Sequence, residues 1–300
     1  MRSPATDIPR LCNALTVDIE DWFQVGAFEH VIRRDQWNDC AHRFEANTDR
    51  VLDLFARHSV VGTFFILGWV AERAPGLIRC IAAAGHEVAS HGYDHRRVFT
   101  MTADEFRADL RKSKALLEDA GGVPVSGYRA PSFSVDGRNC WAHAVLAEEG
   151  YAYSSSVAPI AHDHYGWPDA PRFAFRPLAD ADLIEVPVTT ASFAGRRFAA
   201  AGGGFFRLLP YAVSRWAIAQ VNRQGEAAMT YFHPWEIDPG QPRISAPLKS
   251  RLRHYTNLAR MEGKIERLIG DFAWGRMDSL VETLCQRSVP YWDGGQATTP

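Results

Sequence analysis

Residues 86–95 have the sequence HEVASHGYDH, an apolar run typical of a strand followed at once by two histidines, His91 and His95. One turn of chain at a strand end would bring both imidazoles to one side, a suitable spacing for two ligands of a divalent ion. Gly92 between them allows the backbone to turn sharply or to approach a bound group closely. Because such a histidine pair is more often structural than metal-binding, a metal site is predicted only if other strand ends carry matching chemistry.

Strand-like and helix-like segments alternate on both sides of this stretch. Strands are expected at 11–17, 60–67, 86–91, 123–128, 151–155, 183–188 and 227–232. Helices are expected at 50–57, 75–84, 102–117, 141–149 and 210–222, and a break in the chain is expected at 202–204. An N-cap at 47–49 would begin the first helix, and a capping box formed by Thr102 and Glu105 would begin the third. This alternation favours an α/β fold of parallel strands with helices outside, as a barrel or an open sheet. In either case catalytic groups gather at the carboxyl ends of the strands.

The character of the chain changes after residue 238. A loop-like segment is followed by expected helices at 252–269 and 277–287. We therefore predict a main domain over residues 10–238, a helical C-terminal extension packed on it over 239–290, and a flexible tail over 291–300. The polar face of the 252–269 helix is basic; packing is its first interpretation, and contact with a membrane surface or a partner is the second.

The composition of the chain argues against a nucleic-acid-binding protein, a disulfide-rich protein and a membrane-spanning protein. The chain has 300 residues, of which 46% are hydrophobic, and a net charge of −2, so no nucleic-acid footprint is expected. Its five cysteines are scattered without a CxxC pair, which argues against a disulfide framework and fits a reducing compartment. No signal peptide and no apolar run of membrane-spanning length are visible, so a soluble, cytoplasmic protein is expected.

Four predicted strand ends carry reactive groups. The first is followed by the acids Asp18, Glu20 and Asp21; the others carry His91 with His95, Arg129, and His233. Two histidines and a carboxylate form a three-ligand site that leaves room for water, as in catalytic metal centres. A bound ion can lower the pKa of its water to about 7. A free carboxylate can then take the water's proton, and a second histidine can protonate a leaving nitrogen.

These residues resemble the NodB-homology polysaccharide deacetylases, carbohydrate esterase family 4. Residues 90–95, SHGYDH, are similar to the family's H-x-x-x-H motif, residues 128–132, YRAPS, to its R-x-P motif, and His233 to its L-x-H histidine. Residues 15–18 match the start of its T-F-D-D motif. The stretches VDIEDWF at 17–23 and HPWE at 233–236 most resemble the exosortase-linked exopolysaccharide deacetylases.

The resemblance implies a distorted (β/α)7 barrel, and it implies a role for each matching residue. Asp18 corresponds to the general base, Arg129 to the arginine that tethers this base, and His233 to the general acid. His91 and His95 correspond to metal ligands. The backbone N–H of Ser132, after Pro131, would help to hold the oxyanion, and Trp235 would lie at the substrate groove. The implied cofactor is a divalent metal, zinc first, with nickel, cobalt and manganese left open.

Two positions depart from the family pattern. Ile19 stands where the family has a second aspartate that ligates the metal, and isoleucine cannot ligate. Since alternate residues of a strand face the same side, Glu20 is predicted to replace it, with Asp21 as the second choice. The family's D-x-x-D-W stretch, which orients the acid histidine, is also not recognisable. Asp163, Asp238 and Glu236 are the candidates to replace it.

Each predicted site residue also has an ordinary structural interpretation. The acids could cap helices or pair with arginine at a barrel rim, Arg129 could form a plain ion pair, and the histidines could simply be hydrogen-bonded. Trp22, Trp167 and Trp235 fit a sugar groove and core packing about equally well.

The first functional hypothesis is a metal-dependent hydrolase that removes N-acetyl groups from amino sugars of a bacterial exopolysaccharide or its lipid-linked precursor. Its partner would be an N-acetylated poly- or oligosaccharide, and peripheral contact with membrane-bound polysaccharide machinery stays open. The second is a hydrolase of small cyclic amides or imides on the same fold. The third is a carbohydrate-binding scaffold that has lost its metal through Ile19.

Overall fold

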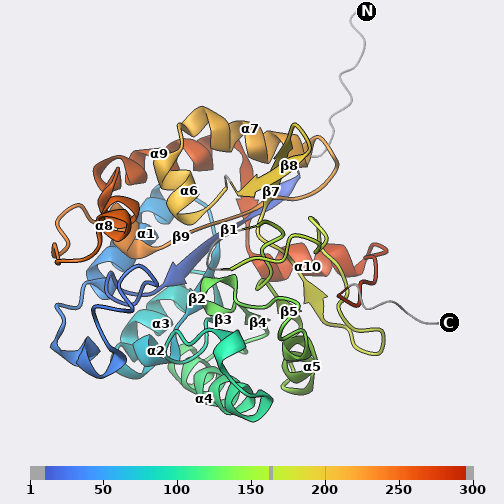
Figure 1. The fold of residues 1–300 in the computed structure, drawn as a ribbon, viewed down its shortest axis with the longest axis horizontal. Coiled ribbons are helices and arrows are strands. Elements are labelled where there is room, and N and C mark those ends of the chain that lie inside the picture. The colour runs from blue at the N-terminus through green and yellow to red at the C-terminus, as the bar shows by residue number, and fades with distance from the viewer. Residues whose placement is uncertain (1–10, 162–164, 200, 295–300) are drawn as a thin grey trace, which may run out of the picture.

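The computed structural model describes residues 11–161, 165–199 and 201–294 (Figure 1). Residues 1–10, Asp163 and residues 295–300, the greater part of the predicted tail, lie outside these ranges. Within them the chain forms a curled sheet with helices around it and a separate two-stranded sheet (Figure 1).

The sheet has eight strands in the order β10-β1-β2-β3-β4-β5-β6, and β9 also pairs with β1. All its strand pairs are parallel. The strands are β1 Cys12–Ile19, β2 Thr63–Ile66, β3 Glu87–Ser90, β4 Gly127–Tyr128, β5 Tyr153–Ser154, β6 Ile184–Glu185, β9 Met229–Phe232 and β10 Ala273–Gly275. The predicted α/β fold with a barrel-like parallel sheet is confirmed, although β10 was not predicted.

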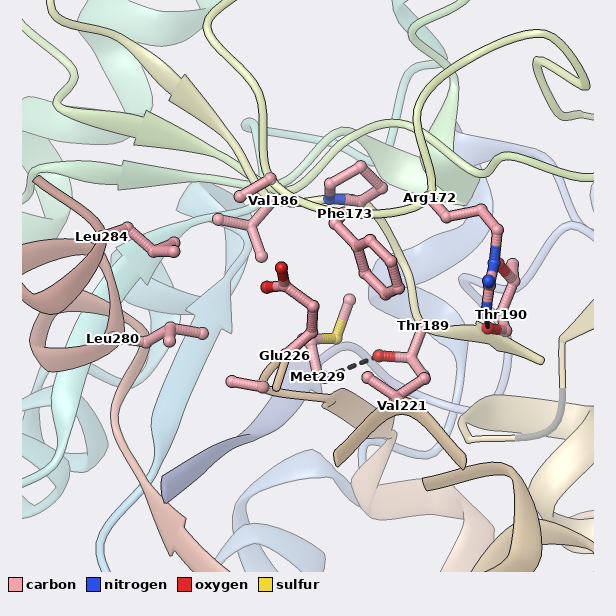
Figure 2. Close-up of a pocket in the computed structure, with 13 residues that line it drawn as sticks. Arg172, Phe173, Val186, Thr189, Thr190, Val221, Glu226, Met229, Leu280 and Leu284 are labelled. Carbon is pink, nitrogen blue, oxygen red and sulfur yellow. Dashed lines mark hydrogen bonds between the residues drawn. The ribbon is translucent and has the colours of Figure 1, made fainter. Parts of the chain in front are cut away.

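The curled sheet does not close by backbone pairing between β6 and β9 in the described chain. Side chains bridge the opening instead: the hydroxyl oxygen of Thr189 accepts the N–H of Met229 at 2.6 Å (Figure 2). Apolar residues such as Val186, Leu280 and Leu284 line a cavity of about 20 Å³ there. A space of this size holds about one water molecule and no larger ligand.

Helices of the chain surround the sheet (Figure 1). They are α1 Phe44–Arg57, α2 Gly68–Arg73, α3 Pro75–Ala83, α4 Ala103–Gly121, α5 Trp141–Glu148, α6 Gly203–Leu208, α7 Tyr211–Asn222, α8 Leu248–Tyr255, α9 Leu258–Asp271 and α10 Met277–Cys285. The predicted capping box of α4 is present: Thr102 and Glu105 each accept the other's backbone N–H. Gly122, with φ of 66°, then ends this helix.

Several elements differ from prediction. Helix α1 begins at Phe44 and not after an N-cap at 47–49, because the carboxylate of Asp21 accepts the N–H groups of Arg43 and Phe44. The helix predicted over 252–269 is two helices, α8 and α9, since Asn257 between them adopts a left-handed conformation with φ of 63°. Helix α2 and the hairpin of β7 Thr190–Phe193 with β8 Arg196–Ala199 were not predicted.

Helix α9 joins the C-terminal part of the chain to the core. Its apolar residues Leu258, Met261, Ile265, Leu268 and Ile269 are all buried in the main hydrophobic cluster. The next strand, β10, pairs with the first half of β1. The segment after residue 238 therefore shares the sheet and the core with the rest of the chain. No helix of the described residues is long and apolar enough to cross a membrane.

Candidate active site

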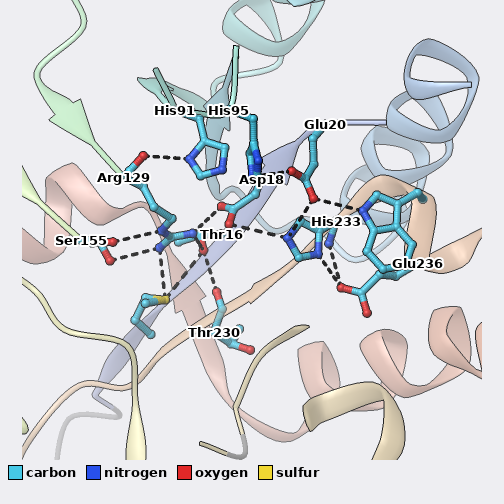
Figure 3. Close-up of polar contacts among 12 residues, drawn as sticks. Thr16, Asp18, Glu20, His91, His95, Arg129, Ser155, Thr230, His233 and Glu236 are labelled. Carbon is cyan, nitrogen blue, oxygen red and sulfur yellow. Dashed lines mark hydrogen bonds and ion pairs between the residues drawn. The ribbon is translucent and has the colours of Figure 1, made fainter. Parts of the chain in front are cut away.

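The register of the parallel strands brings the predicted site residues together. The last residues of neighbouring strands are aligned, as in the pairs Ile19–Ile66, Ile66–Ser90, Ser90–Tyr128 and Val17–Phe232. The residues that follow these ends therefore meet at one edge of the sheet. There Glu20, His91, Arg129 and His233 lie beside one another (Figure 3).

Glu20, His91 and His95 form a compact cluster of possible metal ligands. One nitrogen or oxygen of each side chain lies within 4.8 Å of the others. Gly92 turns the chain with φ of 74°, and His95 is itself left-handed with φ of 58°, a conformation that is uncommon outside glycine. This sharp turn returns His95 to the side of His91, as the spacing of the pair predicts.

The protonation of His91 suits a metal ligand. Its Nδ1 lies 2.8 Å from the carbonyl oxygen of Arg129, and since a carbonyl only accepts, Nδ1 carries the proton. Nε2 then presents its lone pair to the cluster. Burial lowers the pKa of His91 to about 4, which also favours the neutral imidazole.

The residues present fit a divalent ion. Oε2 of Glu20 is buried and pairs with Nε2 of His95 at 2.9 Å, and no further hydrogen-bond partner for it exists within the described chain. Burial raises the pKa of Glu20, but the charges of His95 and His233 outweigh it and lower the pKa to about 2. Two imidazoles and an ionised carboxylate are the donors of many catalytic zinc and related sites.

Asp18 lies beside this cluster and is held by Arg129. The guanidinium of Arg129, which is completely buried, contacts Oδ1 of Asp18 at 2.5 Å and the hydroxyl of Thr16 at 2.7 Å (Figure 3). Its other nitrogens contact Ser155. The second oxygen of Asp18 lies 4.0 Å from Nε2 of His233. The aspartate is thus fixed next to the cluster but is not part of it.

His233 is oriented by a chain of buried charged groups. Its Nδ1 lies 2.7 Å from Oε1 of Glu236, and Oε2 of Glu236 contacts Arg207 at 2.5 Å. Burial lowers the pKa of His233, but Glu20, Glu236 and Asp18 together raise it to about 9. Nε2, the other ring nitrogen, lies 3.5 Å from Oε1 of Glu20.

Of the three acids that could orient His233, the structure places Glu236 against it. Asp238 pairs with Arg43 and Asn47 instead, and Asp163 lies outside the described residues. Arg207 was not singled out from the sequence. No local signal marks it, because its partner Glu236 is 29 residues further along the chain.

Asp21, the second predicted ligand, does not join the cluster. Its Oδ1 accepts the N–H of Trp22, and its Oδ2 accepts those of Arg43 and Phe44 at the start of α1. Burial raises its pKa to about 6 against these hydrogen bonds. The prediction that Asp21 ligates is therefore corrected: this carboxylate caps a helix.

Of the remaining predicted residues, Ser132 and Trp235 lie in the wall of the cavity beside the cluster, whereas Pro131 does not. Ser132 lines a cavity of about 150 Å³ together with Asp18, Glu20 and His233, and it adopts a left-handed conformation with φ of 56°. Strained backbone of this kind is typical of functional sites. Pro131 is buried and does not line this cavity.

Trp235 lines the same cavity, next to His233. It is only 6% exposed and is stacked on His233 and His254, so it offers no open face to a sugar ring. Its indole N–H points at Oε1 of Glu20 from 3.3 Å. The tryptophan therefore holds one oxygen of the predicted ligand.

Two family models match this chain, one on each side of residue 154. Residues 36–153 match the polysaccharide deacetylase family, and residues 155–282 match a domain of unknown function, DUF3473. The chain contains a polysaccharide deacetylase domain of the NodB type.

Curated relatives match parts of this chain. It is 33% identical to the peptidoglycan-N-acetylglucosamine deacetylase of Bacillus cereus over 84 residues, which are 28% of this chain and 30% of that protein. It is 34% identical to the chitooligosaccharide deacetylase of Sinorhizobium fredii over 135 residues, 45% of this chain and 56% of that protein. The chain thus spans about a third to a half of the length of these relatives.

One solved structure shares the whole fold. A Mycobacterium smegmatis protein, provisionally assigned as a polysaccharide deacetylase, superposes with a TM-score of 0.62 at 22% identity and covers 96% of this chain and 95% of that one. At this identity the likeness concerns the fold alone.

The candidate site contains residues from outside the segment that matches the polysaccharide deacetylase family. His91, His95 and Arg129 belong to that segment, whereas Asp18 and Glu20 precede it. His233 and Glu236 come from the DUF3473 region. The deacetylase segment alone therefore lacks part of the site.

Proposed function

We propose that this protein is a metal-dependent N-deacetylase that removes acetyl groups from amino sugars of a bacterial exopolysaccharide or its lipid-linked precursor. The observation that carries this proposal is the cluster of Glu20, His91 and His95 with Asp18 on one side and His233 close by. The stretches at 17–23 and 233–236 support the exosortase-linked branch.

The arrangement assigns a task to each side chain. A divalent ion held by Glu20, His91 and His95 would supply a Lewis acid that polarises the acetyl carbonyl and the attacking water. Asp18 takes a proton from the water while the water oxygen forms a bond to the carbonyl carbon. The Ser132 N–H faces the developing oxyanion. His233 then gives a proton to the nitrogen as the C–N bond breaks, so that acetate and a free amine leave.

Zinc is the first metal we propose, because a site of two imidazoles and one carboxylate is common for it, and nickel, cobalt and manganese suit the same donors. We also propose a cytoplasmic location. All five cysteines are free, as expected in a reducing compartment.

The decisive assay is release of acetate from N-acetylated chitooligosaccharides, measured with the metal added back to purified protein. Ring opening of small cyclic imides serves as the comparison, because the same fold could support it. A second cavity of about 490 Å³ shares Gly26, Ser132 and Tyr231 with the catalytic one, and this space favours an extended substrate. Turnover of imides without acetate release would contradict the proposal.

Replacing Glu236 with glutamine should lower kcat by about 10²-fold or more, since His233 loses the negative partner that fixes its ring and stabilises its charged form. Metal content should stay unchanged, because Glu236 does not belong to the ligand cluster. Acetate-release kinetics and elemental analysis of the same preparation measure both. Loss of metal with little change in kcat per bound ion would show that Glu236 supports the metal site and does not act through His233.

Replacing Trp235 with phenylalanine should weaken metal binding by about 10- to 100-fold, the usual effect of losing a partner of a metal ligand. The ring remains to stack on His254, but the N–H that holds Glu20 is gone. Competition with a chelating dye measures the metal affinity directly. Trp274→Phe is the matched control, because its indole N–H bonds only to the carbonyl of Leu268. Equal metal affinities in the two variants would contradict the assignment.

A further inference from the structure

Residues 239–261 form a basic stretch in a chain whose net charge is −2. They contain no aspartate or glutamate, and their cations are Arg243, Lys249, Arg251, Arg253 and Arg260. Helix α8, Leu248–Tyr255, lies in the middle of this stretch. The stretch around this helix therefore carries a net positive charge.

The same helix exposes large apolar side chains. Leu248 is 68% exposed and Leu252, one turn further on, is 57% exposed. Leu208, 42% exposed, ends α6, which contacts α8. We call these three leucines with Arg251 the α8 surface. Since leucines four residues apart lie on the same face of a helix, their joint exposure to water indicates a surface that meets another phase or molecule.

The α8 surface reaches the active site through Leu208, which lines the cavity of about 490 Å³. Lys249 and Arg253 of α8 line this cavity too, from the side of the helix that does not carry the exposed leucines. That cavity and the catalytic one share the wall residues Gly26, Ser132, Tyr165 and Tyr231. Whatever contacts the α8 surface is therefore next to the route by which a long substrate would reach the catalytic residues.

We propose that the α8 surface docks the protein on an anionic phospholipid bilayer. The leucines enter the interface between headgroups and acyl chains, and Arg251 faces the phosphates, which is how basic amphipathic helices bind membranes. A second copy of the chain fits this surface less well. A two-fold dimer would place each α8 against its equivalent, and their cations would repel one another. The docking goes beyond the proposed function and does not depend on catalysis.

Cosedimentation with lipid vesicles tests the proposal with no substrate present. We expect the wild type to bind vesicles rich in phosphatidylglycerol and to bind phosphatidylcholine vesicles at least about 10-fold more weakly, with the difference lost at high salt. The double variant Leu248→Ser/Leu252→Ser should lose at least about 10-fold in affinity for the anionic vesicles. Arg251→Ser alone should weaken binding less, and it provides a second variant if the double variant does not fold.

Phe193→Ser is the matched control, because Phe193 is 70% exposed on β7, outside the α8 surface. It should bind anionic vesicles like the wild type. Equal loss in Phe193→Ser and the leucine variant would overturn the proposal, as would absence of wild-type binding. A dimer in solution that the leucine substitutions dissociate would overturn it in favour of a second copy. Because binding is measured without turnover, an inactive but membrane-bound protein would refute only the deacetylase assignment.

Discussion

Asp18→Asn should lower the rate of acetate release by about 10²- to 10⁴-fold, the usual contribution of a positioned general base. The amide keeps the shape of the side chain and can still accept a hydrogen bond from Arg129, but it cannot take a proton from water. Since Asp18 is not one of the clustered ligands, the variant should bind metal with unchanged affinity. Acetate kinetics and metal titration of the same sample test both halves of the prediction.

Asp18→Asn should also lower the free energy of unfolding, and this loss of stability must be distinguished from the direct effect on the catalytic rate. Arg129 is completely buried and would lose its carboxylate partner, a change that costs up to about 3–5 kcal/mol. Asp238→Asn is the matched control, because Asp238 is also a buried aspartate paired with an arginine, Arg43, away from the cluster. The control should unfold at a lower temperature yet retain turnover. Similar activities in the two folded variants would exclude Asp18 as the base.

His91→Ala should lose both metal and activity. Removal of one of three ligands should weaken metal binding by more than the roughly 100-fold seen for loss of an outer partner, and turnover should fall with metal content. A metal at 100 times its Kd stabilises a folded protein by about 2.7 kcal/mol, so added zinc should raise the Tm of the wild type but not of the variant. Calorimetry with and without zinc gives a measurement independent of turnover.

The matched control for this variant is His86→Ala. His86 is a buried histidine just before β3, and its Nδ1 accepts the N–H of Gly62 away from the ligand cluster. Its removal should lower the Tm while leaving the zinc-dependent rise in Tm intact. If His91→Ala kept the zinc effect, the cluster would not be the metal site, and the metal-free scaffold would become the better interpretation.

Local patterns predicted the elements that depend on local physics. The capping box of α4 follows from two side chains three residues apart, and the period of two in a strand puts Asp18 and Glu20 on one side while Ile19 enters the core. The same patterns failed at α1 and between α8 and α9. There the helix limits depend on a distant carboxylate and on one left-handed residue.

Periodicity and side-chain chemistry were enough to predict the alternation of strands and helices, the reactive groups at the strand ends, and Glu20 in place of Ile19 as a candidate ligand. The folded chain was needed to show that Asp21 caps a helix, that Asp238 pairs with Arg43 and leaves Glu236 beside His233, and that the indole N–H of Trp235 contacts Glu20. Several of these contacts join residues far apart in the chain: 215 residues separate Trp235 from Glu20, and 195 separate Asp238 from Arg43. Such partners are selected by strand register and core packing, which no local pattern encodes.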